Sequence, residues 1–271
     1  MYISYGGKLL TAKEAFISPN EGFQYGYGLF ETLKVYDKKV YFIDEHLKRL
    51  RNGCKELNIE LHYDLKLIKK YINELIASNS LISGVVKIIY AKNKANYHLL
   101  ITTRENIYNK ERYEKGFSMT FASARKNPHA KLTYIKSNNY LENLLAKEEA
   151  LKNNHDEAIF LNTDGFLSEG SFTNLFFVKE KNIYTPSIEC GILPGIMREK
   201  TIDLINTLGL SLKIGKFTKE ALLHADEIFL TNSLMEIMPV SKLENKIFDL
   251  AQLPITQLLI EKFHDLYNTS I

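Results

Sequence analysis

The sequence predicts a two-domain α/β (α+β) protein, in which a small N-terminal domain (residues 1–105) precedes a larger C-terminal domain (residues 117–271). The chain has 271 residues, which is enough to bury one large core or two smaller ones. Segments with the two-residue alternation of strands are interspersed with segments in which apolar residues have helical spacing. A polar stretch without clear periodicity, residues 106–116, is the predicted interdomain linker.

The composition is that of an ordinary globular protein, with 45% hydrophobic and 25% charged residues. The 35 basic and 32 acidic residues leave a net charge of +3, which is too balanced to indicate nucleic-acid binding but suits an anionic small molecule. We find no signal peptide and no apolar run long enough to span a bilayer, so we expect a cytoplasmic protein with no membrane partner. Cys54 and Cys190 lack the spacing of metal ligands, so we expect free thiols and no metal site.

In the N-terminal domain most of the predicted elements are strands. Gly6-Gly7 supplies the positive φ that a tight hairpin turn needs. The glycines at 22, 26 and 28 allow close backbone approach, but they are not a dinucleotide-binding fingerprint, because no strand precedes them and no helix follows. Asp44 is the predicted N-cap of a helix. The expected elements are strands at 2–5, 8–10, 30–36, 40–43, 85–90 and 97–102, a loop at 18–22, and amphipathic helices at 45–57 and 64–77.

In the C-terminal domain, residues 131–136 are predicted as a strand that ends at Lys136, because Leu132, Tyr134 and Lys136 share one strand face. A helix capped by Ser137 or Asn138 is expected to follow. Its apolar stripe has a period close to 3.6, as in helices that face a core, and consists of Tyr140, Leu141, Leu144, Leu145 and Leu151. The other expected elements are a strand at 117–122, hairpins at 157–170 and 172–186, strands at 227–231 and 236–240, and helices after Gly195, at 219–224 and at 254–267.

Lys136 is the residue around which the candidate chemistry gathers. A lysine between a strand end and a helix start can be partly desolvated, which lowers its affinity for a proton. Such an amine is a nucleophile towards aldehydes. Taken alone, a lysine in this position is more often a solvated surface residue, so the interpretation depends on other parts of the chain.

Those other parts supply what pyridoxal phosphate needs in a binding site. Lys136 is the candidate amine for the aldehyde, and Glu169 is the candidate carboxylate that keeps the pyridine nitrogen protonated, so that the ring can act as an electron sink. The phosphate can be bound by an arginine, by the helix N-terminus after Gly195 and by hydroxyl groups at the end of the strand at 227–231. Tyr140, one turn beyond Lys136, is a candidate donor to the 3-oxygen.

The chain resembles the class IV, fold-type IV pyridoxal phosphate enzymes over nearly its whole length. The motifs that carry the resemblance are residues 26–32 (GYGLFET), 46–50 (HLKRL), 136–141 (KSNNYL), 156–165 (DEAIFLNTDG), 169–176 (EGSFTNLF), 184–186 (YTP), 191–198 (GILPGIMR) and 231–233 (TNS). The resemblance implies two α/β domains with the cofactor in the cleft between them, and a homodimer.

The resemblance also implies roles for single residues. Lys136 matches the Schiff-base lysine and Glu169 the carboxylate on the pyridine nitrogen. Arg49, rather than Arg51, matches the arginine that binds the phosphate. The remaining matches in the cofactor site are backbone phosphate donors and polar side chains, namely Ile196, Met197, Thr231, Asn232 and Tyr140.

Within the family the resemblance favours 4-amino-4-deoxychorismate lyase over two kinds of aminotransferase. Branched-chain enzymes carry an arginine and glycine motif where this chain has residues 34–36 (KVY). D-amino acid enzymes carry an arginine and histidine pair in the loop where this chain has residues 91–96 (AKNKAN). The same loop is short compared with the basic, glycine-rich loop of many lyases, so the residues that bind the substrate carboxylates stay unassigned.

The implied reaction passes through an external aldimine. The substrate amine displaces Lys136, which then removes a proton from the amine-bearing ring carbon, and loss of the enolpyruvyl group yields p-aminobenzoate and pyruvate. Thr32 or Lys136 is the candidate acid that protonates the departing pyruvate. Two alternatives stay open, which are transamination by the same lysine and a non-catalytic protein that binds an anion or a partner through these loops.

Overall fold

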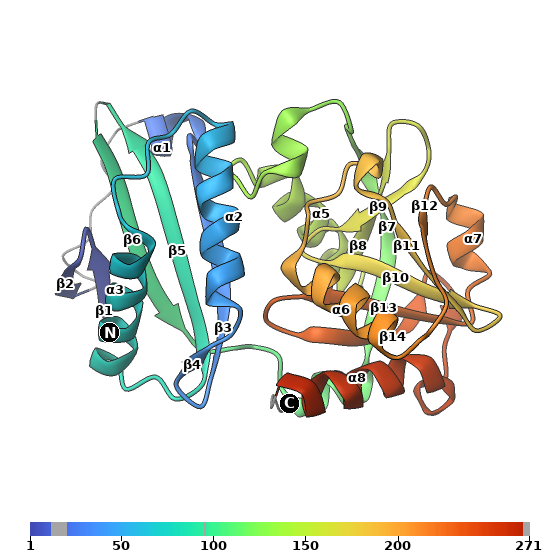
Figure 1. The fold of residues 1–271 in the computed structure, drawn as a ribbon. Coiled ribbons are helices and arrows are strands. Elements are labelled where there is room, and N and C mark those ends of the chain that lie inside the picture. Colours follow the sequence, from blue (N-terminus) through green and yellow to red (C-terminus); the bar gives the residue numbers. More distant parts are fainter. Residues whose placement is uncertain (12–20, 95, 268–271) are drawn as a thin grey trace. The chain divides into compact units, whose positions relative to one another are not determined.

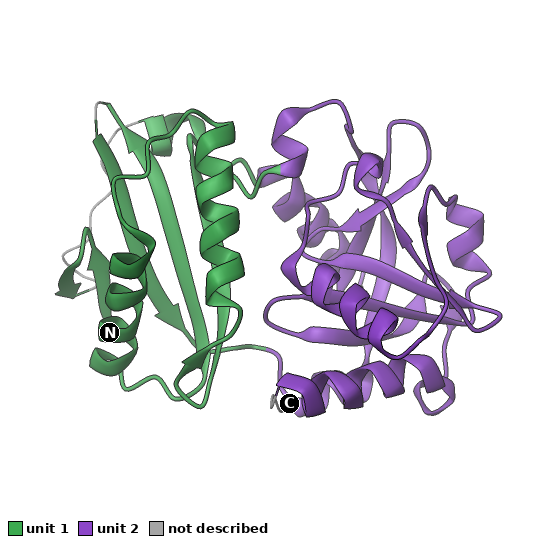
Figure 2. Ribbon diagram, viewed as in Figure 1, with its two compact units in different colours: residues 1–107, 135–140 green, residues 108–134, 141–271 purple. Residues whose placement is uncertain are grey.

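The computed structural model describes residues 1–11, 21–94 and 96–267, which form two compact units (Figures 1 and 2). Unit 1 consists of Met1–Ile107 and Ile135–Tyr140, and unit 2 of Tyr108–Tyr134 and Leu141–Ile271. The chain first leaves unit 1 within the predicted linker, residues 106–116, and helix α4 (Lys110–Lys115) lies in the same stretch. The return of residues 135–140 to unit 1 was not predicted.

Unit 1 contains a six-stranded antiparallel sheet in the order β2-β1-β6-β5-β3-β4. Two helices, α2 and α3, cover one of its faces, and their apolar side chains form a core with alternate strand residues such as Leu33 and Val86 (Figure 1). The elements are β1 (Tyr2–Tyr5), β2 (Lys8–Thr11), α1 (Glu21–Tyr25), β3 (Gly28–Tyr36), β4 (Lys39–Val40), α2 (Ile43–Glu56), α3 (Leu65–Ser78), β5 (Gly84–Asn93) and β6 (Asn96–Arg104).

Most of the elements predicted in this unit are confirmed, with two corrections at helix starts. The helix N-cap expected at Asp44 is wrong, because the N-cap is Phe42, which takes a left-handed conformation (φ 54°), and the helix begins at Ile43. The strand expected at 40–43 is correspondingly limited to Lys39–Val40. Asp44 lies in the first turn instead, where a negative charge still suits the helix dipole. The loop expected at 18–22 lies outside the described residues as far as residue 20, and its last two residues belong to α1.

The strand expected at residues 131–136 is wrong. Lys131–Tyr134 forms a 3₁₀ turn (η1), and the strand-like pairing occurs one residue after the lysine, where Ser137 pairs with Leu29 in an antiparallel bridge. Phe30 N donates to Lys136 O at 3.0 Å, and Asn138 N donates to Gly28 O at 2.9 Å. The lysine backbone is therefore held by β3, because this end of β3 has backbone groups on the side away from β5 that need partners.

Gly28 allows three backbone segments to meet at this point, and we expect Gly28→Ala to lower the free energy of unfolding by about 1–3 kcal/mol through overpacking. An added Cβ would lie 2.6 Å from Tyr90 O, 2.6 Å from Asn138 Nδ2 and 2.8 Å from the Cα of Ala91. Denaturant unfolding measures the change. Gly215→Ala is the control, since a Cβ there meets nothing nearer than 3.4 Å, and an equal loss in both variants would contradict the prediction.

The helix expected after Lys136 is confirmed as α5 (Leu141–Lys152), but its predicted buried stripe is wrong. Neither Ser137 nor Asn138 caps it, because both belong to the segment paired with β3. The buried residues are Asn143, Ala146 and Ala150, and the two alanines pack against Ala158 and Phe160 of the neighbouring strand. The expected stripe is solvent-exposed at four leucines, namely Leu141, Leu144, Leu145 and Leu151.

Unit 2 contains a nine-stranded mixed sheet in the order β12-β11-β10-β13-β14-β7-β8-β9, with β15 paired to β14. The predicted hairpins are confirmed as β8–β9 and β10–β11, and the predicted helices as α6, α7 and α8. The elements are β7 (Phe117–Lys126), β8 (Glu157–Asn162), β9 (Leu167–Gly170), β10 (Asn174–Lys179), β11 (Asn182–Pro186), α6 (Ile196–Thr207), β12 (Leu212–Gly215), α7 (Lys219–Leu223), β13 (Glu227–Asn232), β14 (Glu236–Leu243), β15 (Lys246–Ile247) and α8 (Pro254–Tyr267). No helix in the described part of the chain has the length and apolar character needed to cross a membrane.

Candidate active site

The Lys136 amine lies against two aromatic rings of unit 1. Its Nζ is 4.4 Å from the ring centroid of Phe30 and 5.2 Å from that of Tyr140. The two rings meet edge to face, with centroids 5.2 Å apart and an interplanar angle of 85°. The backbone of Lys136 is also hydrogen-bonded to β3, so both its main chain and its amine have defined neighbours. The side chain is partly buried.

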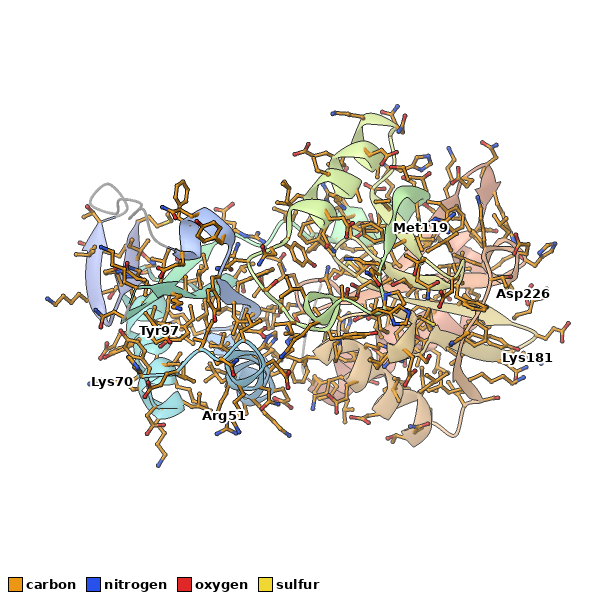
Figure 3. All side chains as sticks on the ribbon, turned by 90° about the horizontal axis from the view of Figure 1, so that it is seen from above. Arg51, Lys70, Tyr97, Met119, Lys181 and Asp226 are labelled. Carbon is orange, nitrogen blue, oxygen red and sulfur yellow. The ribbon has the colours of Figure 1, made fainter. Side chains whose placement is uncertain are left out.

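A second group in unit 1 joins the predicted phosphate arginine to a buried acid. Arg49 Nε donates to Glu31 Oε1 at 2.8 Å, and Arg49 Nη2 donates to Oε2 at 2.7 Å. His46 Nδ1 lies 2.6 Å from the same Oε2. The fork geometry fixes the guanidinium plane of Arg49, which is 18% exposed at its side chain, whereas Glu31 is 1% exposed. Arg51, the alternative that the sequence offered, is exposed on α2 (Figure 3).

Burial acts in opposite directions on the pKa values of Glu31 and His46. Burial alone raises the pKa of Glu31, but the Arg49 guanidinium and His46 outweigh that effect and hold the pKa at about 2. Burial lowers the pKa of His46, although the Glu31 carboxylate acts in the opposite direction. The carboxylate is therefore ionised at neutral pH and the imidazole is neutral, which leaves Arg49 as the cation of the group.

In unit 2 the predicted carboxylate, Glu169, is held on β9 by two donors. Leu193 N donates to Glu169 Oε2 at 2.9 Å, and Asn174 Nδ2 donates to the same oxygen at 3.3 Å. Lys126, a lysine that is only 6% exposed, places its Nζ 4.0 Å from Glu169 Oε1. The carboxylate is 6% exposed, so its position is set by these neighbours rather than by solvent.

The loop that holds Glu169 also forms the start of α6. Gly195 is the N-cap residue of α6, and Ile196 and Met197 follow as the first helical residues. A Cβ at position 195 would lie 1.9 Å from Asn174 Oδ1, so glycine is required for Asn174 to reach Glu169. The first N–H groups of a helix have no partners within it, and they make the helix start a favourable place for a phosphate.

The end of β13 contributes one hydroxyl group and one turn. Thr231 is fully buried, and its Oγ1 has no hydrogen-bond partner among the residues that the structure describes. Buried polar atoms in folded proteins are normally paired, so this hydroxyl is suited to a ligand. Asn232 Oδ1 instead accepts hydrogen bonds from Leu234 N and Met235 N, both at 2.9 Å, and so shapes the turn that follows β13.

The residues present fit pyridoxal phosphate. An amine lies beside aromatic rings in unit 1, and unit 2 holds a buried carboxylate, a helix start without a side-chain cap and a buried hydroxyl without a partner among the described residues. Glu31, His46, Lys126 and Asn174 were not predicted as parts of the site. The signal for Glu31 was present in the sequence, because an acid between Leu29 and Leu33 falls on the core face of a strand.

A family model described as amino-transferase class IV matches residues 28–243. The chain belongs to this family. The aminodeoxychorismate lyase of Bacillus subtilis (strain 168) is 33% identical over 260 residues, which cover 89% of this chain and 86% of that protein. The D-alanine aminotransferase of Bacillus licheniformis is 28% identical over 257 residues, which cover 91% of this chain and 89% of that protein.

Among solved structures, a T.th. branched-chain amino acid aminotransferase with pyridoxamine 5'-phosphate matches this class IV chain with a TM-score of 0.90 and 26% sequence identity. The match covers 98% of this chain and 94% of that chain. The predictions of a fold-type IV enzyme and of pyridoxal phosphate as its cofactor are thereby confirmed. The family contains lyases and aminotransferases, so membership alone does not select the reaction.

Proposed function

We propose that the protein is a 4-amino-4-deoxychorismate lyase, which converts 4-amino-4-deoxychorismate to p-aminobenzoate and pyruvate. The observation that carries the choice is the composition of the β5–β6 connection. Strand pairing continues to Asn93 and Asn96. Residues 91–96 (AKNKAN) include neither the arginine nor the histidine that the family resemblance associates with D-amino acid aminotransferases.

The chain's own residues have separate tasks in this proposal. Pyridoxal phosphate, when bound, supplies the electron sink that stabilises negative charge after a proton is removed. Glu169 keeps the pyridine nitrogen protonated, and Lys126 and Asn174 hold that carboxylate in place. In unit 1 the proposed phosphate ligand is Arg49. In unit 2 the proposed phosphate donors are the backbone of Ile196 and Met197 and the Thr231 hydroxyl. Asn232 supports Thr231 through its turn, and Tyr140 donates to the 3-oxygen.

Lys136 and a residue near it carry out the proton transfers in this proposal. Lys136 would hold the cofactor through its amine, and the same amine would take the proton from the amine-bearing ring carbon of the substrate. Thr32 lies two residues beyond Phe30 on the same face of β3, and it is the proposed donor of the proton that the departing pyruvate requires.

We assign the protein to the cytoplasm as a homodimer, and sedimentation analysis tests the assembly.

A product assay with the purified, cofactor-loaded protein tests the proposal. We expect p-aminobenzoate and pyruvate in equal amounts from 4-amino-4-deoxychorismate, and no keto acid when an amino acid and 2-oxoglutarate are supplied instead. Glutamate formation from a D-amino acid or a branched-chain amino acid, without p-aminobenzoate, would show an aminotransferase. A protein that forms neither product and does not take up the cofactor would be the non-catalytic binder.

A further inference from the structure

The predicted phosphate arginine belongs to a group of side chains that carries no net charge. The Glu31 carboxylate accepts from two nitrogens of Arg49, at 2.8 and 2.7 Å, and so balances its charge within unit 1. The third member, His46, is neutral at pH 7, because burial lowers the pKa of its imidazole. A phosphate monoester carries about −1.5 to −2 charges at pH 7, and this group without net charge would compensate it poorly.

The hydrogen bonds of the group define which nitrogen of His46 carries the hydrogen. Glu31 has a pKa of about 2, so its carboxylate is ionised and can only accept. Nδ1 of His46, 2.6 Å from Glu31 Oε2, is therefore the protonated nitrogen, and Nε2 of the neutral ring has a lone pair. His46 is 1% exposed, and its Nε2 has no hydrogen-bond partner among the residues that the structure describes. Since buried polar atoms are normally paired, this nitrogen is suited to take a proton and donate it to a ligand.

His46 is the member of this group whose charge can change near neutral pH. Arginine keeps its proton in proteins, and Glu31 takes one up only near pH 2. The charged groups that act on His46 come from three elements. Glu31 on β3 favours its protonation, whereas Arg49 on α2 and Lys136, in the segment beside β3, oppose it. An anion at Arg49 acts in the same direction as Glu31, so it raises the proton affinity of the imidazole.

We propose that His46 is a second phosphate-recognition residue of unit 1, which takes up a proton when the phosphate of the cofactor binds at Arg49. The group then has two cations and one carboxylate, and Nε2 has a hydrogen to donate. The inference rests on the proposed function only for the assignment of the phosphate to Arg49. It also gives a reason for an acid beside a phosphate ligand, because Glu31 fixes the guanidinium and stabilises the imidazolium.

Calorimetric titration of the full-length, cofactor-free protein with pyridoxamine phosphate tests the inference without turnover. This ligand carries the phosphate but has no aldehyde that reacts with Lys136. Titrations at neutral pH in buffers with different enthalpies of ionisation give the number of protons taken up, and pyridoxamine, which lacks the phosphate, is the reference ligand. We expect about one proton more for pyridoxamine phosphate than for pyridoxamine.

His46→Gln is the decisive variant, since glutamine can still donate to Glu31 but cannot take up a proton. We expect it to lose the additional proton uptake and to bind pyridoxamine phosphate roughly 10- to 100-fold more weakly, the range for a hydrogen bond to a charged group. The affinity for pyridoxamine should not change. His62→Gln is the matched control, because it removes a histidine that pairs with Glu60 at 3.2 Å on the surface of the same unit.

Nitrogen NMR of the wild-type protein makes the test independent of the folding of the variant. The chain has seven histidines, few enough for their ring nitrogens to be followed individually after isotope labelling. One imidazole should change from neutral to protonated when pyridoxamine phosphate is added and stay neutral with pyridoxamine. The signal that changes should be the one that is missing in His46→Gln.

The outcomes for this inference and for the proposed reaction are distinct. Equal proton uptake with the two ligands, equal uptake in wild type and His46→Gln, or no histidine that becomes protonated would overturn the role of His46. Any of these results in a protein that forms p-aminobenzoate would leave the lyase reaction in place. Proton uptake at His46 in a protein that forms no p-aminobenzoate would overturn the proposed lyase reaction alone.

Discussion

Lys136→Ala is expected to abolish measurable turnover, with a loss of roughly 10²- to 10⁴-fold from the missing proton transfer alone. The loss of covalent attachment adds to this, because the same amine joins the cofactor in the proposed mechanism. The alanine leaves the backbone bonds of residue 136 to β3 intact, since Phe30 N donates to a main-chain oxygen. The variant should therefore fold and still lack activity.

Two measurements make the Lys136 prediction specific. Borohydride reduction followed by peptide mass spectrometry should find the cofactor fixed to the peptide that contains Lys136 in the wild-type protein, and no fixed cofactor in Lys136→Ala. Lys131→Ala, in the η1 turn just before it, is the control and should keep both the attachment and the activity. A cofactor adduct on another lysine, or full activity in Lys136→Ala, would disprove the assignment.

Glu31→Ala is expected to lower the free energy of unfolding by about 3–5 kcal/mol, the usual cost of removing one partner of a buried ion pair. The substitution leaves Arg49 without the carboxylate that accepts from its Nε and Nη2, and leaves His46 without a partner for Nδ1. Denaturant unfolding measures the loss. The control is Glu60→Ala, because Glu60 pairs with His62 at 3.2 Å on the surface, where such pairs contribute at most about 1 kcal/mol.

The pH dependence of stability provides an independent check on Glu31. Its pKa in the folded protein is about 2, and the ordinary value is 4.5. Between these values the unfolded chain binds the proton more tightly, so the stabilisation is fully present above pH 4.5 and is lost as the pH falls towards 2. Wild-type stability should therefore fall more steeply with acidification than that of Glu31→Ala, and equal slopes would count against the buried pair.

The parts of the fold that were predicted correctly depend on local patterns. The strands at 85–90 and 97–102 are short runs rich in apolar residues and are close in sequence, so their pairing followed directly. Residues 131–136 also had a strand-like pattern, but the partner of Ser137 is Leu29, which is more than a hundred residues earlier in the chain. No local pattern identifies a partner at that separation, and the segment forms a 3₁₀ turn followed by a single bridge.

The face of a helix is also harder to predict than its existence. The leucine spacing identified α5 correctly, but the buried side consists of Ala146, Ala150 and Asn143. Small residues allow the helix to approach the strand that carries Ala158 and Phe160 closely, which leaves the larger side chains outside. Hydrophobicity ranks leucine above alanine, so a pattern based on hydrophobicity selects the opposite face.

In the candidate site, the predicted residues are those whose chemistry is unusual for their position. A lysine shortly before a helix, an acid near the end of a buried strand and a glycine directly before a helix are visible in the sequence as Lys136, Glu169 and Gly195. Asn174 and Lys126 orient Glu169, but an asparagine and a lysine near strand ends have no distinctive local pattern. Their roles depend on the β9–β10 connection and on the length of β7, which only the fold defines.

The origin of unit 1 from two separate stretches of chain has a consequence for its synthesis. A nascent chain that ends at Ile107 already contains all six strands of the unit 1 sheet, yet Phe30 N and Gly28 O still lack the partners that Lys136 and Asn138 provide. Since domains fold largely in the order in which the ribosome makes them, the sheet forms first and the lysine segment joins it only after β7 has emerged. The segment that carries Lys136, the proposed nucleophile, is therefore the last part of unit 1 to be put in place.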